Sequence, residues 1–591
     1  MSTVRESAIA KRRRLNNGTP TPASDSDLSA ASTVVKKTKA KKRVKEILTD
    51  AVVAVGDPAS SQAYNEEHVE GLDDNSFEPL ASANVVKFSG SREIEAIDQD
   101  AIKVRLSRYQ KCYVHGVAKL WIRDGSVSAC GATLTESAQT YTVFASVSDA
   151  PVAIQAESRA AEFQLESVSI SDNGTPSPLH VPGKFGLGSK ADATSFRVLG
   201  HGDEPGPAER PGIDSANAFD TDIATHKLGL AISNLATPKP HVLICGRRHS
   251  STSAASIALV NRCLSEATTT SSVGQAGVAF LDLDYASPTF GCPGTVSVTY
   301  IKDFVLGPSY THPLSPNSIS RNRLVASHFI GSGEHSNVDM PEKSIIEQLM
   351  RSDKSLLKSP WVTRTGAWVA TASSEDLSHL HKMTSPDLVL NIDSSKSSPY
   401  YDAAIALTQL NSARFAHIPY TRSGTESSVA EHRYALQSHF RLHGYVDGVP
   451  LWYTSSIPSI GTRQLVLPID DRENGLSFVS VRGGVLRLED ITEALQEALV
   501  TLVTVKSAQD SPRPSAAPFG LRHIDYSKVV QHLGLACVEH IDEFSKTIYL
   551  STPVSASQIQ ASLKDGLDVG LVLEKPGPSG RFSRHLLFEK S

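Results

Sequence analysis

The sequence predicts an α/β protein in which a central, mostly parallel sheet is flanked by an N-terminal β domain and a C-terminal α+β domain. A short apolar strand over 240–245 ends at Gly246, and the apolar residues of 253–264 recur at helical spacing. A second apolar strand, 277–281, runs directly into acidic residues. Strand, glycine loop, helix and second strand in this order predict a βαβ unit of a parallel sheet.

Changes in composition divide the 591-residue chain into five segments. Short strands at about ten-residue spacing predict the N-terminal β domain, and a stretch rich in Gly, Pro, Ser and Asp predicts an irregular connection after it. Towards the other end, helical spacing over 488–503 predicts a helix, and 546–553 predicts a strand. The segments are a disordered tail with basic clusters (1–83), the N-terminal β domain (84–165), the connection (166–235), the central domain (236–460) and the C-terminal domain (461–591).

The N-terminal tail differs from the rest of the chain in charge. Residues 1–45 contain twelve Lys and Arg but three Asp and Glu, whereas the whole chain carries a net charge of −5. Basic clusters at 11–14 and 36–45 in such a tail are typical of nuclear-import or nucleic-acid-binding patches, with a merely solvated charge run as the alternative. We therefore expect a nuclear protein whose nucleic-acid contacts are local.

The spacing of the cysteines argues against a disulfide-rich or zinc-binding protein, and the hydropathy of the chain argues against a membrane protein. Six scattered cysteines without a CxxC pair favour free, mostly buried thiols over a disulfide framework or a zinc site. No apolar run approaches the ~18 residues that a membrane helix needs, so we expect no membrane partner.

The segment between the first central strand and its helix stands where a phosphate-binding loop belongs. Such a loop, GxxxxGK(S/T), wraps phosphates with backbone N–H groups, reaches them with Lys and holds Mg²⁺ with a hydroxyl. Here Ser251 replaces the second Gly and Thr252 replaces the Lys, while Ser253 keeps the hydroxyl. An ordinary strand–helix turn is the alternative interpretation. The candidate nucleotide-binding residues are Gly246, Arg247, Arg248, His249, Ser250, Ser251, Thr252 and Ser253.

Further stretches that carry a family pattern follow this loop in a fixed order. They lie at 278–284, 293–297, 305–308, 327–331 and 431–440. Together they resemble the polynucleotide 5′-hydroxyl kinases, particularly the fungal nucleolar branch that processes ribosomal RNA and is related to a messenger-RNA cleavage-factor branch. The first stretch is similar to the Walker B strand of that family and the second to its substrate clasp. The resemblance implies a P-loop-NTPase-like sheet and a P-loop kinase-like central domain.

The resemblance also implies a reaction and a set of roles. The reaction is the ATP-dependent phosphorylation of RNA 5′-hydroxyl ends in pre-ribosomal RNA, with Mg²⁺ and a nucleolar location. Asp282 and Asp284 are the implied groups that activate the hydroxyl or order the metal, with Ser253 as a second Mg²⁺ ligand beside Asp282. Arg433 is the implied lid residue over the phosphates. The implied substrate clasp consists of Pro293, Gly294, Thr295 and a base-stacking Trp368.

Each of these roles has a structural alternative, and the pattern itself changes in places. The two aspartates can cap the end of a strand, Trp368 can belong to the core, and Arg433 can form a surface ion pair with Glu431. Residues 284–287 lack the Gly and Gln of the family, and 363–368 is one residue out of register with its Asn-Thr-x-Gly-Trp stretch.

Together with the missing loop Lys, these changes predict weak or absent binding of ATP and Mg²⁺. Two functions remain. One is a polynucleotide 5′-hydroxyl kinase, a transferase, with reduced or lost catalysis. The other is a pseudokinase scaffold that binds RNA and an endonuclease partner of a ribosomal-RNA-processing complex.

Overall fold

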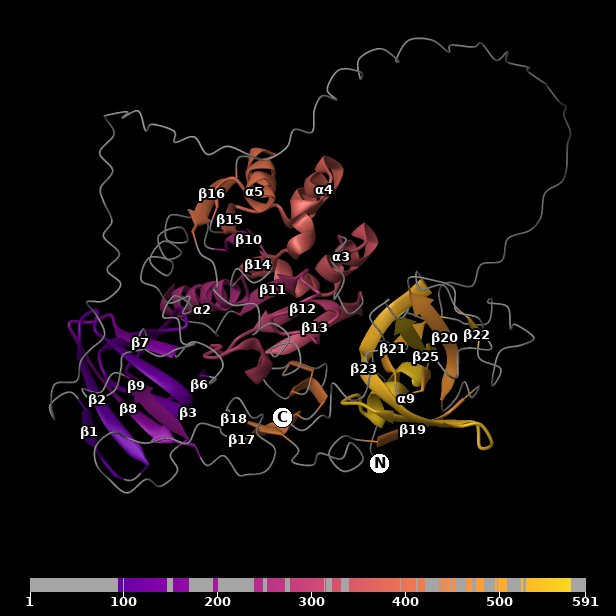
Figure 1. Ribbon diagram of the computed structural model, residues 1–591, viewed down its shortest axis with the longest axis horizontal. Coiled ribbons are helices and arrows are strands. Elements are labelled where there is room, and N and C mark those ends of the chain that lie inside the picture. The colour runs from indigo at the N-terminus through magenta and orange to yellow at the C-terminus, as the bar shows by residue number, and fades with distance from the viewer. Residues whose placement is uncertain are drawn as a thin grey trace, which may run out of the picture. The chain divides into compact units, whose positions relative to one another are not determined.

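The computed structural model contains three large sheets and a short hairpin, drawn from indigo to yellow along the chain in Figure 1. The predicted tail over 1–83 lies outside the residues that the structure describes. The described residues are 94–98, 100–145, 152–168, 195–199, 239–247, 252–270, 277–312, 314, 321–330, 340–393, 395–410, 413–419, 435–436, 438–440, 442–446, 449–452, 464–469, 475–482, 495–496, 498–506, 522–523 and 528–574.

The first sheet has nine strands that pair antiparallel, and alternate residues of its strands are buried in one core. Its last strand, β9, lies within 166–235, where we expected irregular structure. β9 pairs with β3 but is only four residues long, too short for a periodic pattern to predict it. The strands are β1 (Ile94–Ala96), β2 (Ala101–Ser107), β3 (Lys111–Asp124), β4 (Ser126–Ala129), β5 (Ala132–Thr135), β6 (Thr140–Ala145), β7 (Val152–Ala156), β8 (Ala160–Ser167) and β9 (Phe196–Leu199).

The second sheet is the predicted central, mostly parallel sheet, so the predicted fold class is confirmed. Its strand order is β13-β12-β11-β14-β10-β15-β16. The five strands from β11 to β16 in this order are parallel, and β12 and β13 complete the sheet as antiparallel neighbours. The strands are β10 (His241–Gly246), β11 (Val278–Asp282), β12 (Thr295–Ile301), β13 (Arg323–Phe329), β14 (Trp361–Arg364), β15 (Leu388–Ile392) and β16 (Arg414–Ile418).

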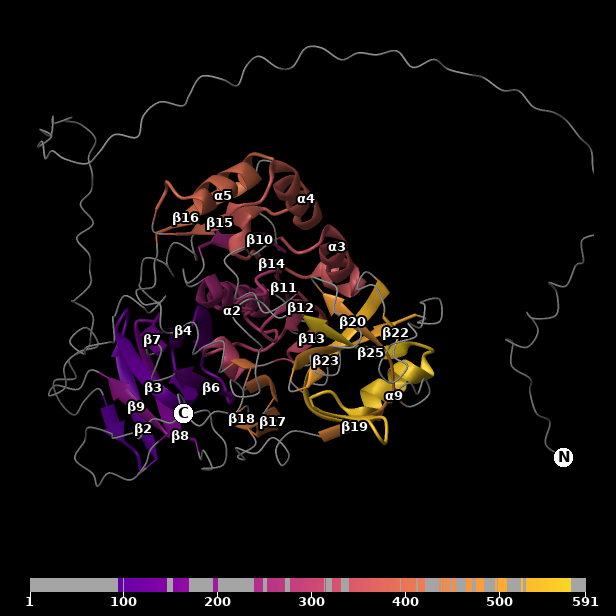
Figure 2. The same ribbon diagram turned by 45° about the vertical axis from the view of Figure 1, so that its right-hand side comes forward.

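Helices cover both faces of the central sheet (Figure 2). Val242 and Ile244 of β10 face helix α2, whereas Leu243 and Cys245 face the helices of the other side, because successive side chains of a strand point to opposite faces. The strands β10, β11 and β15 are therefore buried on both sides and read as nearly continuous apolar runs. The helices are α2 (Thr252–Thr270) on one face, α3 (Lys343–Arg351), α4 (Ser374–Thr384) and α5 (Pro399–Gln409) on the other, and the 3₁₀ turns η4 (Ser309–Thr311), η5 (Lys354–Lys358) and η6 (Ala367–Ala370).

The turn between β4 and β5 holds helix α2 in place. Gly131 in this turn has a φ of +79°, and a Cβ there would lie 2.4 Å from the carbonyl oxygen of Ala258 on α2. One turn further along α2, Asn261 Nδ2 donates to the carbonyl oxygens of Cys130 and Val305, at 2.8 Å each. Only glycine permits both this backbone conformation and this close approach, so the N-terminal sheet and the central sheet share one helix.

The third sheet belongs to the predicted C-terminal α+β domain. The strand predicted over 546–553 is confirmed as β24, but the helix predicted over 488–503 is wrong where the strand β21 begins at Leu499. The β-branched Val and Thr residues of β21 favour a buried strand, and apolar runs of this length do not separate strand from helix by period alone. The elements are β19 (Gln464–Pro468), β20 (Leu476–Arg482), β21 (Leu499–Val505), β22 (Arg522–His523), β23 (Val529–Asp542), β24 (Thr547–Ser551), α9 (Ala556–Lys564) and β25 (Asp568–Glu574), preceded by the hairpin β17 (Leu442–Val446) and β18 (Val449–Trp452).

The edge strand β13 of the central sheet contacts β23 of the third sheet. The backbone N–H of Phe329 in β13 donates to Nδ1 of His532 in β23 at 3.0 Å. Beside it, Nε2 of Gln348 on helix α3 donates to the carbonyl oxygen of Val530 in β23 at 2.9 Å. A small cavity beside this contact is lined by residues of both sheets and by His439. His439 is buried, and its Nε2 has no hydrogen-bond partner among the described residues.

The described residues also bear on the predictions about cysteines and membrane helices. All six cysteines are free thiols and five of them are buried, as predicted. No helix in the described part of the chain is long and apolar enough to cross a membrane.

Burial of His439 predicts a loss of stability in acid. Burial lowers the pKa of His439 from 6.5 to about 4, because the charged imidazolium is not solvated there. Below pH 6.5 the unfolded chain therefore binds a proton that the folded chain does not, and stability falls by ~1.4 kcal/mol per pH unit until pH 4. Between pH 7 and pH 5, His439→Gln should remove about 2 kcal/mol of acid destabilisation, measured by urea unfolding at each pH. The exposed His540 supplies the control variant, His540→Gln, and an equal change of pH dependence in both variants would contradict the prediction.

Candidate functional site

The candidate site lies at the carboxyl ends of three adjacent strands of the central sheet, where ligands of parallel α/β proteins bind. Gly246 ends β10, Asp282 ends β11 and Arg364 ends β14. Because β14 lies between the other two strands, Arg364 pairs in register with Asp282 on one side and with Ile244 on the other. Segments separated by more than 80 residues in sequence therefore meet at this edge.

Asp282 is fully buried and both of its oxygens accept hydrogen bonds from the backbone. Its Oδ1 accepts from the N–H of Asp284 at 3.1 Å, and its Oδ2 accepts from the N–H of Thr289 at 2.6 Å. Burial raises the pKa of Asp282 to about 6; the positive charge of Arg364 opposes this shift and the neighbouring Asp284 adds to it. The carboxyl group is thus held in a fixed orientation by the loop that follows β11.

The cation of the site is the guanidinium of Arg364, whose side chain is only 3% exposed. Its Nη2 donates to Asp284 Oδ2 at 2.6 Å, and its Nη1 lies 3.6 Å from Asp282 Oδ2. A planar guanidinium with five donors suits two carboxylates better than a lysine would. Arg364 therefore balances both acidic groups that the sequence singled out.

The other donors of Arg364 reach the start of helix α2 and the loop after β11. Nε donates to Thr252 Oγ1 at 3.2 Å, and Nη1 donates to Thr289 Oγ1 at 3.0 Å and to the carbonyl oxygen of Ser287 at 2.6 Å. Ser253 Oγ donates to the same Thr289 Oγ1 at 3.3 Å. We call this set of groups the Arg364 cluster: Thr252, Ser253, Asp282, Asp284, Ser287, Thr289 and Arg364.

The structure brings together only part of the predicted nucleotide-binding loop. Gly246 is buried at the end of β10, Arg247 is exposed beyond it, and Thr252 and Ser253 begin α2. Four residues of the loop lie outside the described residues: Arg248, His249, Ser250 and Ser251. The predicted lid residue Arg433 also lies outside them.

The predicted clasp forms a buried turn at the start of β12. Gly294, at a φ of +86°, donates its N–H to the carbonyl oxygen of Tyr285 at 2.9 Å and accepts the N–H of Ile330 at 2.7 Å. Pro293 and Thr295 beside it are also buried. These bonds join the clasp turn to the loop that carries Asp284 on one side and to the end of β13 on the other.

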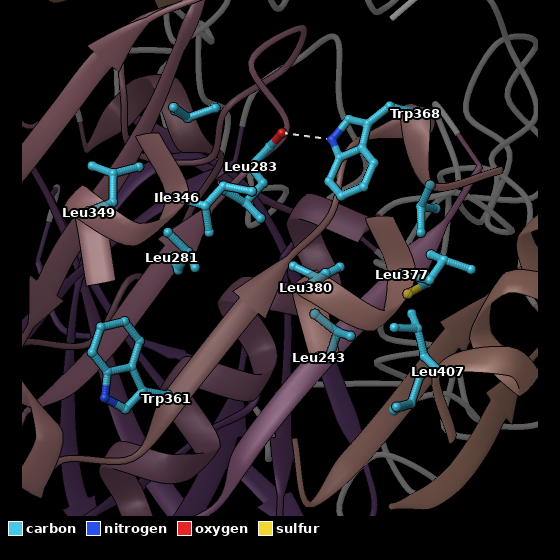
Figure 3. Close-up of a cluster of buried hydrophobic side chains, with 14 of the residues drawn as sticks. Leu243, Leu281, Leu283, Ile346, Leu349, Trp361, Trp368, Leu377, Leu380 and Leu407 are labelled. Carbon is cyan, nitrogen blue, oxygen red and sulfur yellow. Dashed lines mark hydrogen bonds between the residues drawn. The ribbon is translucent and has the colours of Figure 1, made fainter. Parts of the chain in front are cut away.

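Trp368 lies in the core on the α3–α5 side of the sheet (Figure 3). Its side chain is almost fully buried, and its Nε1 donates to the carbonyl oxygen of Leu283 at 3.1 Å. A ring without an exposed face offers no platform for stacking a base. Of the two interpretations that the sequence left open, the core position is the one that fits this burial.

The donor set of the Arg364 cluster does not fit Mg²⁺. P-loop kinases hold this ion with the loop hydroxyl, an aspartate and phosphate oxygens, in near-octahedral geometry. Here both oxygens of Asp282 accept backbone N–H groups, and Asp284 accepts from a guanidinium. Among the described residues, no three His, Cys, Asp or Glu side chains are grouped to hold a metal ion. The positive charge that the metal would bring is already present.

The sequence of this chain is similar to those of several known proteins. Residues 246–438 match the family described as the P-loop of the mRNA cleavage and polyadenylation factor CLP1. The polynucleotide 5′-hydroxyl-kinase grc3 of Aspergillus clavatus is 27% identical over 459 residues, which are 71% of this chain and 53% of that protein. The protein of the same name from Aspergillus terreus is 25% identical over 562 residues, which are 80% of this chain and 67% of that protein. The chain is therefore similar to the polynucleotide 5′-hydroxyl-kinase family over most of its length, which supports the family that its sequence indicated.

The chain spans about half to two thirds of the length of those two relatives. A solved structure of wild-type Clp1p with Pcf11p aligns with 81% of this chain and 98% of that protein, at 14% identity and a TM-score of 0.48. A second, from work on the interface between Pcf11p and Clp1p, aligns with a TM-score of 0.46.

Sequence reasoning missed the two residues that organise the site, Arg364 and Thr289. The only signal for Arg364 is that it ends the apolar segment Trp361–Arg364 inside the stretch that is out of register with the family pattern. The signal for Thr289 is its place in Pro288-Thr289-Phe290, within the stretch that resembles the family, but that resemblance assigns it no role; its role arises from the path of the loop after Asp284. Arg364 reaches the site because of the order of the strands, and Thr289 because of the path of its loop. Neither feature can be read from the residues that neighbour them in sequence.

Removal of Arg364 should destabilise the protein strongly. Arg364→Gln leaves two buried carboxylates without their counter-charge, and breaking a buried ion pair in this way costs about 3–5 kcal/mol. Arg323→Gln is the matched control, because Arg323 also donates to an aspartate at 2.6 Å but its side chain is 49% exposed. Such exposed pairs contribute about 0–1 kcal/mol. Urea unfolding of both variants should separate them, and equal stability would show that the Arg364 cluster is not a structural unit.

Proposed function

We propose that this chain binds the 5′ ends of RNA in a kinase-type fold and transfers phosphate to them slowly or not at all. The family relationship supports the fold and the substrate class, since the relatives are named polynucleotide 5′-hydroxyl kinases. The reduced transfer rests on the site of this chain itself. The two halves of the proposal are therefore testable apart.

The observation that carries the proposal is the hydrogen bond from Arg364 to Thr252. In P-loop kinases the residue at the position of Thr252 is a lysine that reaches the β- and γ-phosphates. Here that position holds a hydroxyl, which accepts from Arg364 Nε at 3.2 Å and is buried. Cationic stabilisation of the transferring phosphoryl group contributes roughly 10³–10⁵ in rate. The arginine is directed at the carboxylates rather than at a phosphate.

The wider setting of the proposal is ribosomal-RNA processing. The stretches at 278–284 and 431–440 resemble the nucleolar branch of the family, and this resemblance supports pre-ribosomal RNA as substrate and an endonuclease as partner. A chain that no longer transfers phosphate would serve there as a scaffold for both.

Two measurements test the proposal: phosphate transfer by the natural chain, and ATP binding by variants of the loop and of Arg364. The full chain with Mg²⁺-ATP and a 5′-hydroxyl RNA oligonucleotide should show transfer at most about 10⁻³ of that of an active family member. Ser251→Gly with Thr252→Lys should tighten ATP binding little, because the new ammonium would face the Arg364 guanidinium. Adding Arg364→Asn to both changes should tighten it about tenfold, the effect of one charge-assisted contact. Robust transfer by the natural chain, abolished by Asp282→Asn, would refute the proposal.

RNA binding without nucleotide provides the second arm of the test. Contacts to RNA phosphates release counterions, so binding of the oligonucleotide should persist without ATP and weaken steeply as salt rises. Filter binding at 50 and 200 mM salt measures this. An absence of binding at low salt would contradict the RNA half of the proposal, whatever the transfer assay shows.

Nuclear localisation is the third expected outcome. The basic clusters at 11–14 and 36–45 are the proposed import signals. A fluorescent fusion without residues 1–45 should lose the nuclear concentration that the full chain shows. An unchanged distribution would mean that these clusters do not direct import.

A further inference from the structure

We propose that the guanidinium of Arg364 is a permanent replacement for the divalent metal of this site, so that the Asp282–Asp284 pair excludes Mg²⁺ in the natural chain. The proposal deepens the proposed function, on which it rests in assigning this edge of the sheet to nucleotide chemistry. It adds a claim that the proposed function does not make: the carboxylate pair is a metal site that one substitution has closed.

The carboxylate oxygens that a metal would need already accept hydrogen bonds from the protein. A divalent metal needs oxygens with free lone pairs that converge on one point. Asp282 accepts from two backbone N–H groups, one at each oxygen, and Asp284 Oδ2 accepts from Arg364 Nη2 at 2.6 Å. Both carboxylates that the family resemblance assigns to the metal therefore already accept hydrogen bonds within the protein.

The positive charge of Arg364 also opposes the binding of a divalent metal beside it. A guanidinium cannot lose its proton in a protein, so Arg364 carries its positive charge at every relevant pH. It lies within 3.6 Å of both carboxylates. A divalent cation bound to the same oxygens would lie next to this fixed charge in a buried environment, where charge repulsion is weakly screened. Arg364 and a metal ion thus compete for one position.

Both the main chain and the side chain of Arg364 are held in place by the surrounding protein. Its main chain belongs to β14, which is paired on both sides, with β10 and with β11. Its side chain makes four hydrogen bonds, to Thr252, Asp284, Ser287 and Thr289, and is 3% exposed. A metal would have to displace a cation that the sheet itself holds in place.

Titration with Mn²⁺, followed by the electron-spin-resonance signal of the free ion, tests the proposal on the full chain without nucleotide or RNA. The natural chain should show no site tighter than ~0.1 mM. Arg364→Asn should gain one such site, and Mn²⁺ should raise its melting temperature. Adding Asp282→Asn to Arg364→Asn should remove the site again.

Two further variants make the result specific. Arg323→Asn also frees an aspartate, but at the exposed Arg323–Asp353 pair, and it should gain no site. Arg364→Lys keeps the positive charge and should bind no Mn²⁺, so it tests the charge argument even if Arg364→Asn does not fold. A site tighter than ~0.1 mM in the natural chain that Asp282→Asn abolishes would overturn the proposal. So would metal binding by Arg364→Lys, or a folded Arg364→Asn that gains no site.

These outcomes are separate from those of the transfer assay. A natural chain that binds Mn²⁺ through Asp282 but transfers no phosphate contradicts this inference and leaves the proposed function intact. A natural chain that binds no Mn²⁺ but phosphorylates RNA contradicts the proposed function and leaves the metal replacement intact.

Discussion

The interaction on which the site depends is the burial of one positive charge between two negative ones. A guanidinium and two carboxylates cannot enter the interior of a protein singly, because each loses its hydration. In this chain the three groups enter together, at the ends of two adjacent strands, and backbone N–H groups of the loop after β11 bind both oxygens of Asp282. The loop, the start of α2 and the end of β14 are arranged around this requirement.

The same cluster contains residues from each segment in which the sequence departs from the family pattern. Without a lysine at the position of Thr252, the carboxylates lack one source of positive charge, and Arg364 supplies it from the neighbouring strand. Ser287, in the stretch that lacks the family Gly and Gln, contributes its carbonyl oxygen to Arg364. The three segments that depart from this pattern therefore meet in one hydrogen-bonded cluster.

The sequence predicts what depends on local pattern and misses what depends on strand order. The β10–α2–β11 unit and the position of Asp282 follow from apolar runs, helical spacing and a terminal acid. Arg364 does not, because its strand β14 enters between β10 and β11 from about 80 residues further along the chain. Trp368 illustrates a second limit, since an aromatic residue serves equally as core or platform until its burial is known. β21 illustrates a third, since a short Val-rich run fits either period.

The double hydrogen bond of Asn261 has a consequence for the order in which the chain can assemble during synthesis. Its side-chain amide bonds to Cys130, which precedes it by 131 residues, and to Val305, which follows it by 44. Domains fold as units as they leave the ribosome, the N-terminal one first. The turn at Cys130 and Gly131 is thus already formed when α2 emerges, and it offers the nascent helix a docking surface before the sheet beneath that helix is complete.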